Sequence, residues 1–294
     1  MVVYNMNKYA EGGGGVKKIG IIANTLKTEY KDYIGGIAGS LDGRAEVYMS
    51  TESGVPGINT VTEAELLSTV DYMLVMGGDG TMISAAGGLA RNKIPVLGIN
   101  LGRIGFMTEI EPDMTAAALD KLLSGEYKTE KRMMMKARII KDNEEICTFH
   151  ALNDIVVSKA AGVRLVGLEL FTDGELVNRY IADGLILATP TGSTGYSISA
   201  GGPVVDPNMK LFVATPICAH MLSVRSAVLS SDKEIVIRQD MSYGAHEAIV
   251  TADGEVQHSL TGDEKVIITR SQYELELIKI GNQSFYDTLI KKLS

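Results

Sequence analysis

Strand-like and helical patterns alternate over the first 125 residues, and this alternation limits the fold more than any other feature. Compact apolar runs at 18–23 and 72–76 are typical of buried strands. Between them, apolar residues recur at helical spacing over 30–41, and Thr62 and Glu65 have the spacing of a capping box. Strands separated by helices predict βαβ units on a parallel, Rossmann-like sheet. Further elements are expected at 45–49, 94–99 and 112–125.

After about Lys128 the pattern changes to short strand-like runs with few helical stretches, separated by turn signals such as Asp173-Gly174. We therefore expect a second, mostly β domain, followed by a tail with helical spacing at 286–293 that packs back on the protein. The expected strands are 132–140, 155–157, 164–171, 185–188, 211–214, 234–237, 249–251 and 266–269. The expected divisions are a flexible leader at 1–16, an α/β domain at 17–128, a β-rich domain at 129–272 and the tail at 273–294.

Charge and cysteine content exclude several classes of protein. Lys and Arg number 28 against 36 Asp and Glu, a net charge of −8, which argues against nucleic-acid and membrane-surface partners. Two cysteines, Cys147 and Cys218, are too few for a disulfide scaffold and are expected to be free, buried thiols. We find no apolar run long enough to span a membrane and no signal peptide, so a cytoplasmic location is expected.

The loop from Gly77 to Thr81 (GGDGT) lies between a predicted strand and a predicted helix. This arrangement presents backbone N–H groups to an anion, and glycines let a phosphate approach the backbone closely. A carboxylate in such a cradle, here Asp79, is repulsive to phosphate unless it binds a metal or accepts a proton. The alternative is that Asp79 is only a turn or cap residue.

A longer segment, DGLILATPTGSTGYSISAGGP, runs from Asp183 to Pro203. An apolar strand leads into a loop with six hydroxyl side chains between Thr189 and Ser199, and hydroxyls suit sugar, amide and phosphate groups. Tyr196 is placed to stack on a base. The alternative is a Ser- and Gly-rich turn at a sheet edge.

Two shorter signals are weaker. Asn153-Asp154 precedes a predicted strand, where an amide and a carboxylate suit a purine, an amide or ribose hydroxyls, although the pair is also a common turn. The segment Gly102–Phe106 follows a strand end, where Arg103 is a candidate phosphate contact and Phe106 a candidate base contact, or both lie in a plain loop. The four histidines show no metal-ligand spacing, so no metal ligand is assigned.

With these motifs in order along the chain, the sequence resembles the NAD kinase (ATP-NAD kinase) family from about Lys17 to its C-terminus. The GGDG core is shared with diacylglycerol kinases, sphingosine kinases and phosphofructokinases, whereas the segment 183–203 is far more specific. The motifs that carry the resemblance are GGDGT at 77–81, GRIGF at 102–106, LND at 152–154, the segment 183–203, AHMLSVRS at 219–226 and SFYDTL at 284–289.

The resemblance implies a kinase that phosphorylates the 2′-hydroxyl of the adenosine ribose of NAD with ATP or another phosphoryl donor. It implies an α/β N-terminal domain, a β-rich C-terminal domain and a tail that returns to the N-terminal domain. It also implies a divalent metal ion, usually Mg²⁺, and a homodimer or homotetramer.

The same resemblance implies roles for individual residues. Asp79 is the expected general base, with Gly80 beside it, and Asn153 and Asp154 are expected to hold the dinucleotide. The remaining dinucleotide contacts implied are Arg164, Asp183, Thr194, Gly195, Tyr196, Ser197, Ile198 and Ser199. Gly77, Gly78, Thr81, Arg103 and Phe106 are further candidates for phosphate or base contacts.

The chain departs from the family pattern at a few positions. Asp154 stands where Glu is more usual, Gly195 where Ala is common, and Thr25 where Pro is common. Ile181 stands where many bacterial members have Arg. Two alternatives to an NAD kinase are a lipid kinase of the diacylglycerol or sphingosine type, which shares GGDG, and a non-catalytic dinucleotide sensor.

Overall fold

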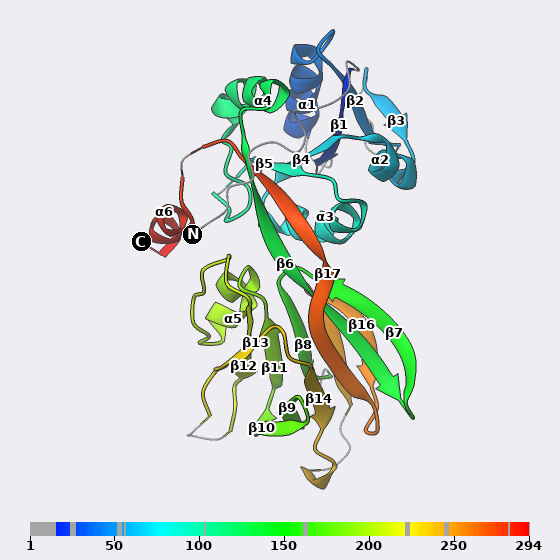
Figure 1. Cartoon of the computed structure of the whole chain (residues 1–294), viewed down its shortest axis with the longest axis vertical. Helices are drawn as coiled ribbons and strands as arrows, with labels where there is room; N and C mark the ends of the chain where they lie inside the picture. Colours follow the sequence, from blue (N-terminus) through cyan, green and yellow to red (C-terminus); the bar gives the residue numbers. More distant parts are fainter. Residues whose placement is uncertain are drawn as a thin grey trace. The chain divides into compact units, whose positions relative to one another are not determined.

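The computed structural model divides into two compact units (Figure 1). One unit holds the described residues up to Lys131 together with those from Leu275 onward, and the other holds Arg132–Glu274. Two long strands, β6 (Lys128–Lys141) and β17 (Lys265–Lys279), begin in one unit and end in the other. The structure describes residues 16–23, 28–51, 55, 57–102, 104–160, 164–220, 224–243, 247–281 and 283–293.

A parallel sheet forms the centre of the first unit, with strand order β5-β4-β1-β2-β3. Every residue of β4 and β5 is buried, as expected of a parallel sheet covered on both faces. Figure 1 shows α1 and α4 on one side of this sheet and α2 and α3 on the other. The bounds are β1 Lys17–Ala23, α1 Thr28–Ser40, β2 Ala45–Ser50, β3 Asn59–Val61, α2 Glu63–Thr69, β4 Tyr72–Gly77, α3 Asp79–Asn92, β5 Val96–Asn100, η1 Pro112–Met114 and α4 Thr115–Ser124.

Alternate strand residues supply the core of this unit. Ile19 and Ile21 of β1 pack in one cluster with Leu74 of β4 and with apolar residues of α1 and α4. The predicted capping box is confirmed, because Thr62 and Glu65 exchange both of its hydrogen bonds at the start of α2. The alternation of strands and helices therefore produced the parallel α/β architecture expected.

The second unit is mostly β, as expected. A six-stranded antiparallel sheet has the order β13-β12-β11-β8-β15-β16, and β9 pairs antiparallel with both β10 and β14. Apolar residues of both sets of strands, such as Val157 and Leu168, share one core. The bounds are β7 Glu144–Ala151, β8 Asp154–Lys159, β9 Val166–Thr172, β10 Glu175–Ala182, β11 Gly184–Ala188, η2 Gly192–Thr194, α5 Tyr196–Ser199, β12 Leu211–Ile217, β13 Ala227–Ser230, β14 Ile235–Gln239, η3 Met241–Tyr243, β15 Ala248–Ala252 and β16 Glu255–Leu260.

Some features differ from the expectations. Five of the strands that the structure describes were not anticipated. Each of β7, β10 and β16 carries several polar, exposed residues that weaken the apolar pattern, and β3 and β13 are only three and four residues long. Cys147 and Cys218 are free, as expected, but neither is fully buried, because Cys147 is partly exposed and Cys218 is exposed. The expected leader falls outside the described residues except for Val16.

The tail forms α6 (Phe285–Leu293), and it belongs to the first unit. The last residues of β17 belong to that unit as well, since Leu277 pairs with Val96 of β5. The tail therefore returns to the N-terminal unit, as the family resemblance implied. None of the helices that the structure describes is long and apolar enough to cross a membrane.

Candidate functional site

Asp79 is the first residue of α3, and Gly78 alone separates it from the end of β4 at Gly77. The carboxyl ends of parallel strands are where α/β proteins bind ligands, and a helix begins at the same point with its N–H groups free of intrahelical partners. Gly78 precedes the helix in an extended conformation. The sequence motif therefore lies in the structural context that it requires.

The Asp79 carboxylate is held by the loop that follows β5. Its Oδ2 accepts a hydrogen bond from the backbone N–H of Phe106 at 2.9 Å, and its Oδ1 accepts one from that of Met107 at 3.0 Å. The loop itself folds back on β5, because the N–H of Asn100 donates to the carbonyl oxygen of Ile110 at 2.7 Å. Asp79 is thus a fixed carboxylate and not a mobile turn residue.

Two glycines make this arrangement sterically feasible. A Cβ at Gly105 would overlap the Asp79 carboxylate, and a Cβ at Gly77 would overlap the Thr81 side chain. In contrast, a Cβ at Gly78 or Gly80 would meet nothing within 4 Å. The loop is therefore closely packed on one side and open on the other, where a phosphate can approach the backbone.

A lysine from the tail also reaches Asp79. The Lys292 ammonium lies 3.3 Å from Asp79 Oδ2 and 4.3 Å from the centroid of the Phe106 ring. The same ring packs on Phe285 of α6, with 5.6 Å between the ring centroids. Lys292 is not recognisable as a site residue from the sequence, because 213 positions separate it from Asp79.

In the second unit, the backbone of Asn153 and Asp154 is held by Asp253, which no sequence motif indicated as a site residue. Asp253 Oδ1 accepts hydrogen bonds from the backbone N–H groups of Asn153 at 2.7 Å and Asp154 at 3.1 Å, and its Oδ2 accepts one from Leu152 at 2.7 Å. Asp253 and Gly254 form the turn between β15 and β16, both with positive φ. The Asp-Gly pair signals such a turn in the sequence, but not the residues that it contacts.

The loop after β11 holds the same segment from another direction. Thr189 donates its hydroxyl to the carbonyl oxygen of Leu152 at 2.6 Å, and its N–H donates to that of Asn153 at 2.8 Å. A Cβ at Gly192 would overlap the Asn153 carbonyl group. The two motifs are thus in direct contact in the fold.

Asn153, Asp154 and Asp253 border a pocket with a volume of about 420 Å³. The Oδ1 atom of Asn153 and the hydroxyl oxygen of nearby Thr191 are buried without a hydrogen-bond partner. Buried polar atoms of this kind are unfavourable unless a ligand or water satisfies them. The pocket is lined by Asn153, Asp154, Val156, Ser158, Tyr196, Thr251, Asp253 and Gly254.

Burial, together with the nearby negative charge of Asp253, raises the pKa of Asp154 to about 7. Burial also raises the pKa of Asp253, but three backbone N–H groups oppose that effect by stabilising its charged form. When this pair shares one proton, Asp154 is therefore the residue that holds it. Asp154 can thus donate or accept a hydrogen bond toward a ligand near neutral pH.

The hydroxyl-rich segment is used largely inside the protein. Ser193 and Ser197 are fully buried, and Ser197 shares a hydrogen bond with Thr215 at 3.0 Å. The Thr194 hydroxyl donates to the carbonyl oxygen of Thr191 at 3.1 Å. In contrast, Tyr196 lines the pocket and is 48% exposed. Several hydroxyls of the segment are therefore bonded internally, and Tyr196 is its one residue among those that line the pocket.

Two other expected site residues lie elsewhere. Asp183 precedes β11 and pairs with Lys159 at 2.7 Å, whereas the opposite end of β11, at Ala188, pairs with Asp154. Arg164 is exposed and does not line the pocket. Arg103 lies outside the described residues.

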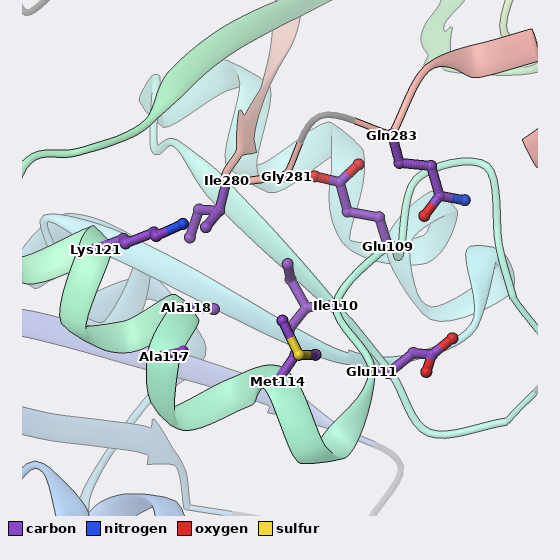
Figure 2. Close-up of a pocket in the computed structure, with 10 residues that line it drawn as sticks. All are labelled: Glu109, Ile110, Glu111, Met114, Ala117, Ala118, Lys121, Ile280, Gly281 and Gln283. Carbon is purple, nitrogen blue, oxygen red and sulfur yellow. The ribbon is translucent and has the colours of Figure 1, made fainter. Parts of the chain in front are cut away.

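A separate cavity of about 310 Å³ lies in the first unit between α4 and the segment that leads into α6 (Figure 2). Ile110, Met114 and Ile280 give it apolar walls, and Glu109 lines it too. Glu109 forms an ion pair with Lys279, the last residue of β17. Asp79 does not line this cavity, so the cavity is distinct from the loop that carries the candidate base.

Comparison with known proteins agrees with this architecture. The ATP-NAD kinase N-terminal domain model matches residues 19–127, and the ATP-NAD kinase C-terminal domain model matches residues 152–280. An NAD kinase of Carboxydothermus hydrogenoformans is 41% identical over 242 residues, which is 82% of this chain and 86% of that protein. An NAD kinase of Natranaerobius thermophilus is 36% identical over 284 residues, 95% of this chain and 98% of the relative.

Two solved structures share the fold. An NAD kinase from Archaeoglobus fulgidus in complex with ATP has a TM-score of 0.73 and 27% identity, and the match covers 94% of this chain and 98% of that one. Yeast NADH kinase complexed with NADH has a TM-score of 0.84 over 94% of this chain and 86% of that one. Its identity of 23% supports the fold alone.

Proposed function

This chain belongs to the ATP-NAD kinase family, and we propose that Asp79 is the general base that activates the acceptor hydroxyl in the family's reaction. The chain is a phosphotransferase that converts NAD to NADP with ATP as phosphoryl donor. The single observation that carries the role of Asp79 is the fixed position of its carboxylate between the start of α3 and the N–H groups of Phe106 and Met107.

The chemistry explains why a carboxylate is needed there. A ribose hydroxyl is a weak nucleophile at neutral pH, and phosphoryl transfer depends on alignment, charge neutralisation and removal of the hydroxyl proton. In the proposed step Asp79 accepts the proton of the 2′-hydroxyl, and the ribose oxygen forms a bond to the γ-phosphorus of ATP. The bond from that phosphorus to the β,γ-bridging oxygen breaks, and ADP leaves.

We propose that the pocket beside Asn153 and Asp154 holds the dinucleotide. The unpaired Oδ1 of Asn153 can accept a hydrogen bond from an amide or amino group, and Asp154 can bond to ribose hydroxyls. The exposed ring of Tyr196 offers a stacking surface for a base. Gly80, Thr194, Gly195, Ser197, Ile198 and Ser199 remain proposed contacts, Ser197 through its backbone because its side chain is bonded internally.

A divalent ion is proposed to enter with ATP, as part of the substrate. Among the described residues no group of three or more His, Cys, Asp or Glu side chains is placed to hold a metal ion. Mg²⁺ is commonly held by substrate phosphates with only one or two carboxylates, so ATP would supply most of its ligands. The ion would neutralise phosphate charge during transfer.

We propose a homodimer or homotetramer in the cytoplasm. Arg164 is exposed, so its side chain is accessible to a dinucleotide held by a second copy, and Asp183 remains a proposed contact. The two free cysteines are consistent with a reducing compartment. Light scattering on the purified protein measures the assembly, and a monomer would contradict this part of the proposal.

The test of the base is Asp79→Asn. With ATP, Mg²⁺ and NAD, and with NADP detected by an NADP-specific dehydrogenase, we expect kcat to fall by more than about 100-fold. NAD affinity measured by calorimetry should change little. Asp120→Asn, at an exposed ion pair with Arg44, is the matched control and should keep wild-type kcat.

Normal turnover by Asp79→Asn would disprove the assignment of the base. A lipid acceptor of the diacylglycerol or sphingosine type serves as the second arm of the assay, and we expect no phosphorylated lipid. NAD binding without any NADP formation by the wild type would instead support a dinucleotide sensor.

A further inference from the structure

The C-terminal helix α6 contacts the Asp79 region through residues near both of its ends. At its start, Ser284 and Asp287 form a reciprocal cap, in which the N–H of Ser284 donates to Asp287 Oδ2 at 2.9 Å and the N–H of Asp287 donates to Ser284 Oγ at 3.1 Å. Phe285 packs on Phe106, whose N–H holds Asp79. Near its end the helix places Lys292 against Asp79.

Lys292 completes a set of three donors around Asp79. Oδ2 accepts from Phe106 N–H and lies 3.3 Å from the Lys292 ammonium, while Oδ1 accepts from Met107 N–H. The Lys292 ammonium also lies over the Phe106 ring, so the aromatic face and the carboxylate restrict it from two sides. The position of the carboxylate therefore depends on a residue of the tail.

Stability alone does not account for this ion pair. The side chains of Lys292 and Asp79 are 31% and 23% exposed, and ion pairs open to solvent contribute little to folding. A general base, however, must present one oxygen toward the hydroxyl in a narrow range of geometry. An ammonium beside Oδ2 restricts the rotation of the carboxylate and offsets its repulsion of the phosphate charge.

We propose that Lys292 is a positioning residue that orients Asp79 for proton abstraction, so that docking of the C-terminal helix completes the phosphoryl-transfer site. This inference rests on the proposed role of Asp79 as the base. Lys292 itself does not touch the substrate in this proposal, and it affects the reaction by orienting Asp79. The requirement is for a cation at the end of α6, so Arg should substitute for Lys in part.

The test compares Lys292→Met, Lys292→Arg and the control Lys291→Met, an exposed residue one position earlier on the same helix. We expect Lys292→Met to lower kcat by roughly 10- to 100-fold, the size of effect that misplacement of a catalytic group produces. The KM for NAD should stay within about 2-fold, because the interaction acts in the chemical step. Lys292→Arg should recover most of the loss, and Lys291→Met should match the wild type.

A double-mutant cycle separates a positioning role from a structural one. If Lys292 acts through Asp79, Lys292→Met should have no further effect on the residual kcat of Asp79→Asn. An equal loss in both backgrounds would overturn the inference, and so would a faster Lys292→Met enzyme, because the contact would then be inhibitory. If Lys292→Met keeps wild-type kcat while Asp79→Asn is inactive, the inference about Lys292 is overturned and the proposed base stands. Full activity of Asp79→Asn would overturn the proposed base as well.

Discussion

The Oδ1 atom of Asp253 accepts a hydrogen bond from the backbone N–H of Asn153 at 2.7 Å, across 100 positions of the sequence. The same carboxylate accepts from the N–H groups of Leu152 and Asp154. One side chain thus satisfies three consecutive N–H groups of the segment that carries the proposed dinucleotide contacts. The pocket is therefore shaped by a hairpin turn as well as by its own loop.

Asp253→Asn tests this relationship. An amide keeps the shape and tolerates positive φ, but it offers one acceptor oxygen in place of two and turns its NH₂ toward N–H donors. Hydrogen bonds to a charged group contribute about 1.5–3 kcal/mol each, so we expect unfolding free energy to fall by about 2 kcal/mol or more in urea titrations. NAD affinity measured by calorimetry should fall at least about 10-fold.

The matched control is Asp173→Asn, at the exposed Asp-Gly turn between β9 and β10. Asp173 accepts one backbone hydrogen bond, from the N–H of Glu234 at 3.1 Å. Its substitution by Asn should leave NAD affinity unchanged. Equal losses of affinity in the two variants would contradict a specific role for Asp253.

Asp154 makes stability depend on pH. Its pKa rises from an ordinary value of 3.8 to about 7 through burial and the charge of Asp253. Between these two pH values the folded state binds more protons than the unfolded state, so stability falls as pH rises through this window. One pKa unit corresponds to about 1.4 kcal/mol. The free energy of unfolding of Asp154→Asn, measured relative to that of the wild type, should therefore rise by about 2–3 kcal/mol from pH 5 to pH 8.

Urea unfolding at the two pH values measures the difference. Asp232→Asn, at an exposed carboxyl in the same unit, is the control, and it should show the same difference from wild type at both pH values. A constant difference for Asp154→Asn as well would show that this carboxyl does not hold the proton.

Gly192 is required by a close backbone contact rather than by an unusual φ. A Cβ there would overlap the Asn153 carbonyl group and come within 2.7 Å of the Asn153 Cα, and these backbone atoms are held by Thr189 and Asp253. Gly192→Ala should therefore cost about 2 kcal/mol or more of stability and weaken NAD binding.

The control for this substitution is Gly36→Ala, at an exposed position in the middle of α1 where a Cβ meets nothing within 4 Å. It should be neutral or stabilise the protein by up to about 1 kcal/mol, because Ala favours a helix. Thermal unfolding and calorimetry compare the two variants. Unchanged NAD affinity in a folded Gly192→Ala protein would contradict the packing argument.

Local patterns in the sequence were sufficient for the fold class and for the position of Asp79 at the start of a helix. The Gly77–Thr81 loop needs only a strand before it and a helix after it, and both have strong local periodicity. Lys292 and Asp253 could not be found in this way, because their importance depends on contacts across 213 and about 100 positions. Nor does the residue type of Ser197 reveal that Thr215 already bonds its hydroxyl.

The ion pair between Glu109 and Lys279 should matter for stability rather than for catalysis. Both side chains are largely buried, at 9% and 20% exposure, and Glu109 Oε1 has no hydrogen-bond partner. Removing one member of such a pair leaves a buried charge without a counterion, so Lys279→Met should lower the unfolding free energy by about 3 kcal/mol. The double variant Glu109→Gln with Lys279→Met removes both charges and should recover most of that loss in urea titrations. If the double variant were no more stable than Lys279→Met alone, the cost would come from lost packing of the lysine and not from the buried carboxylate.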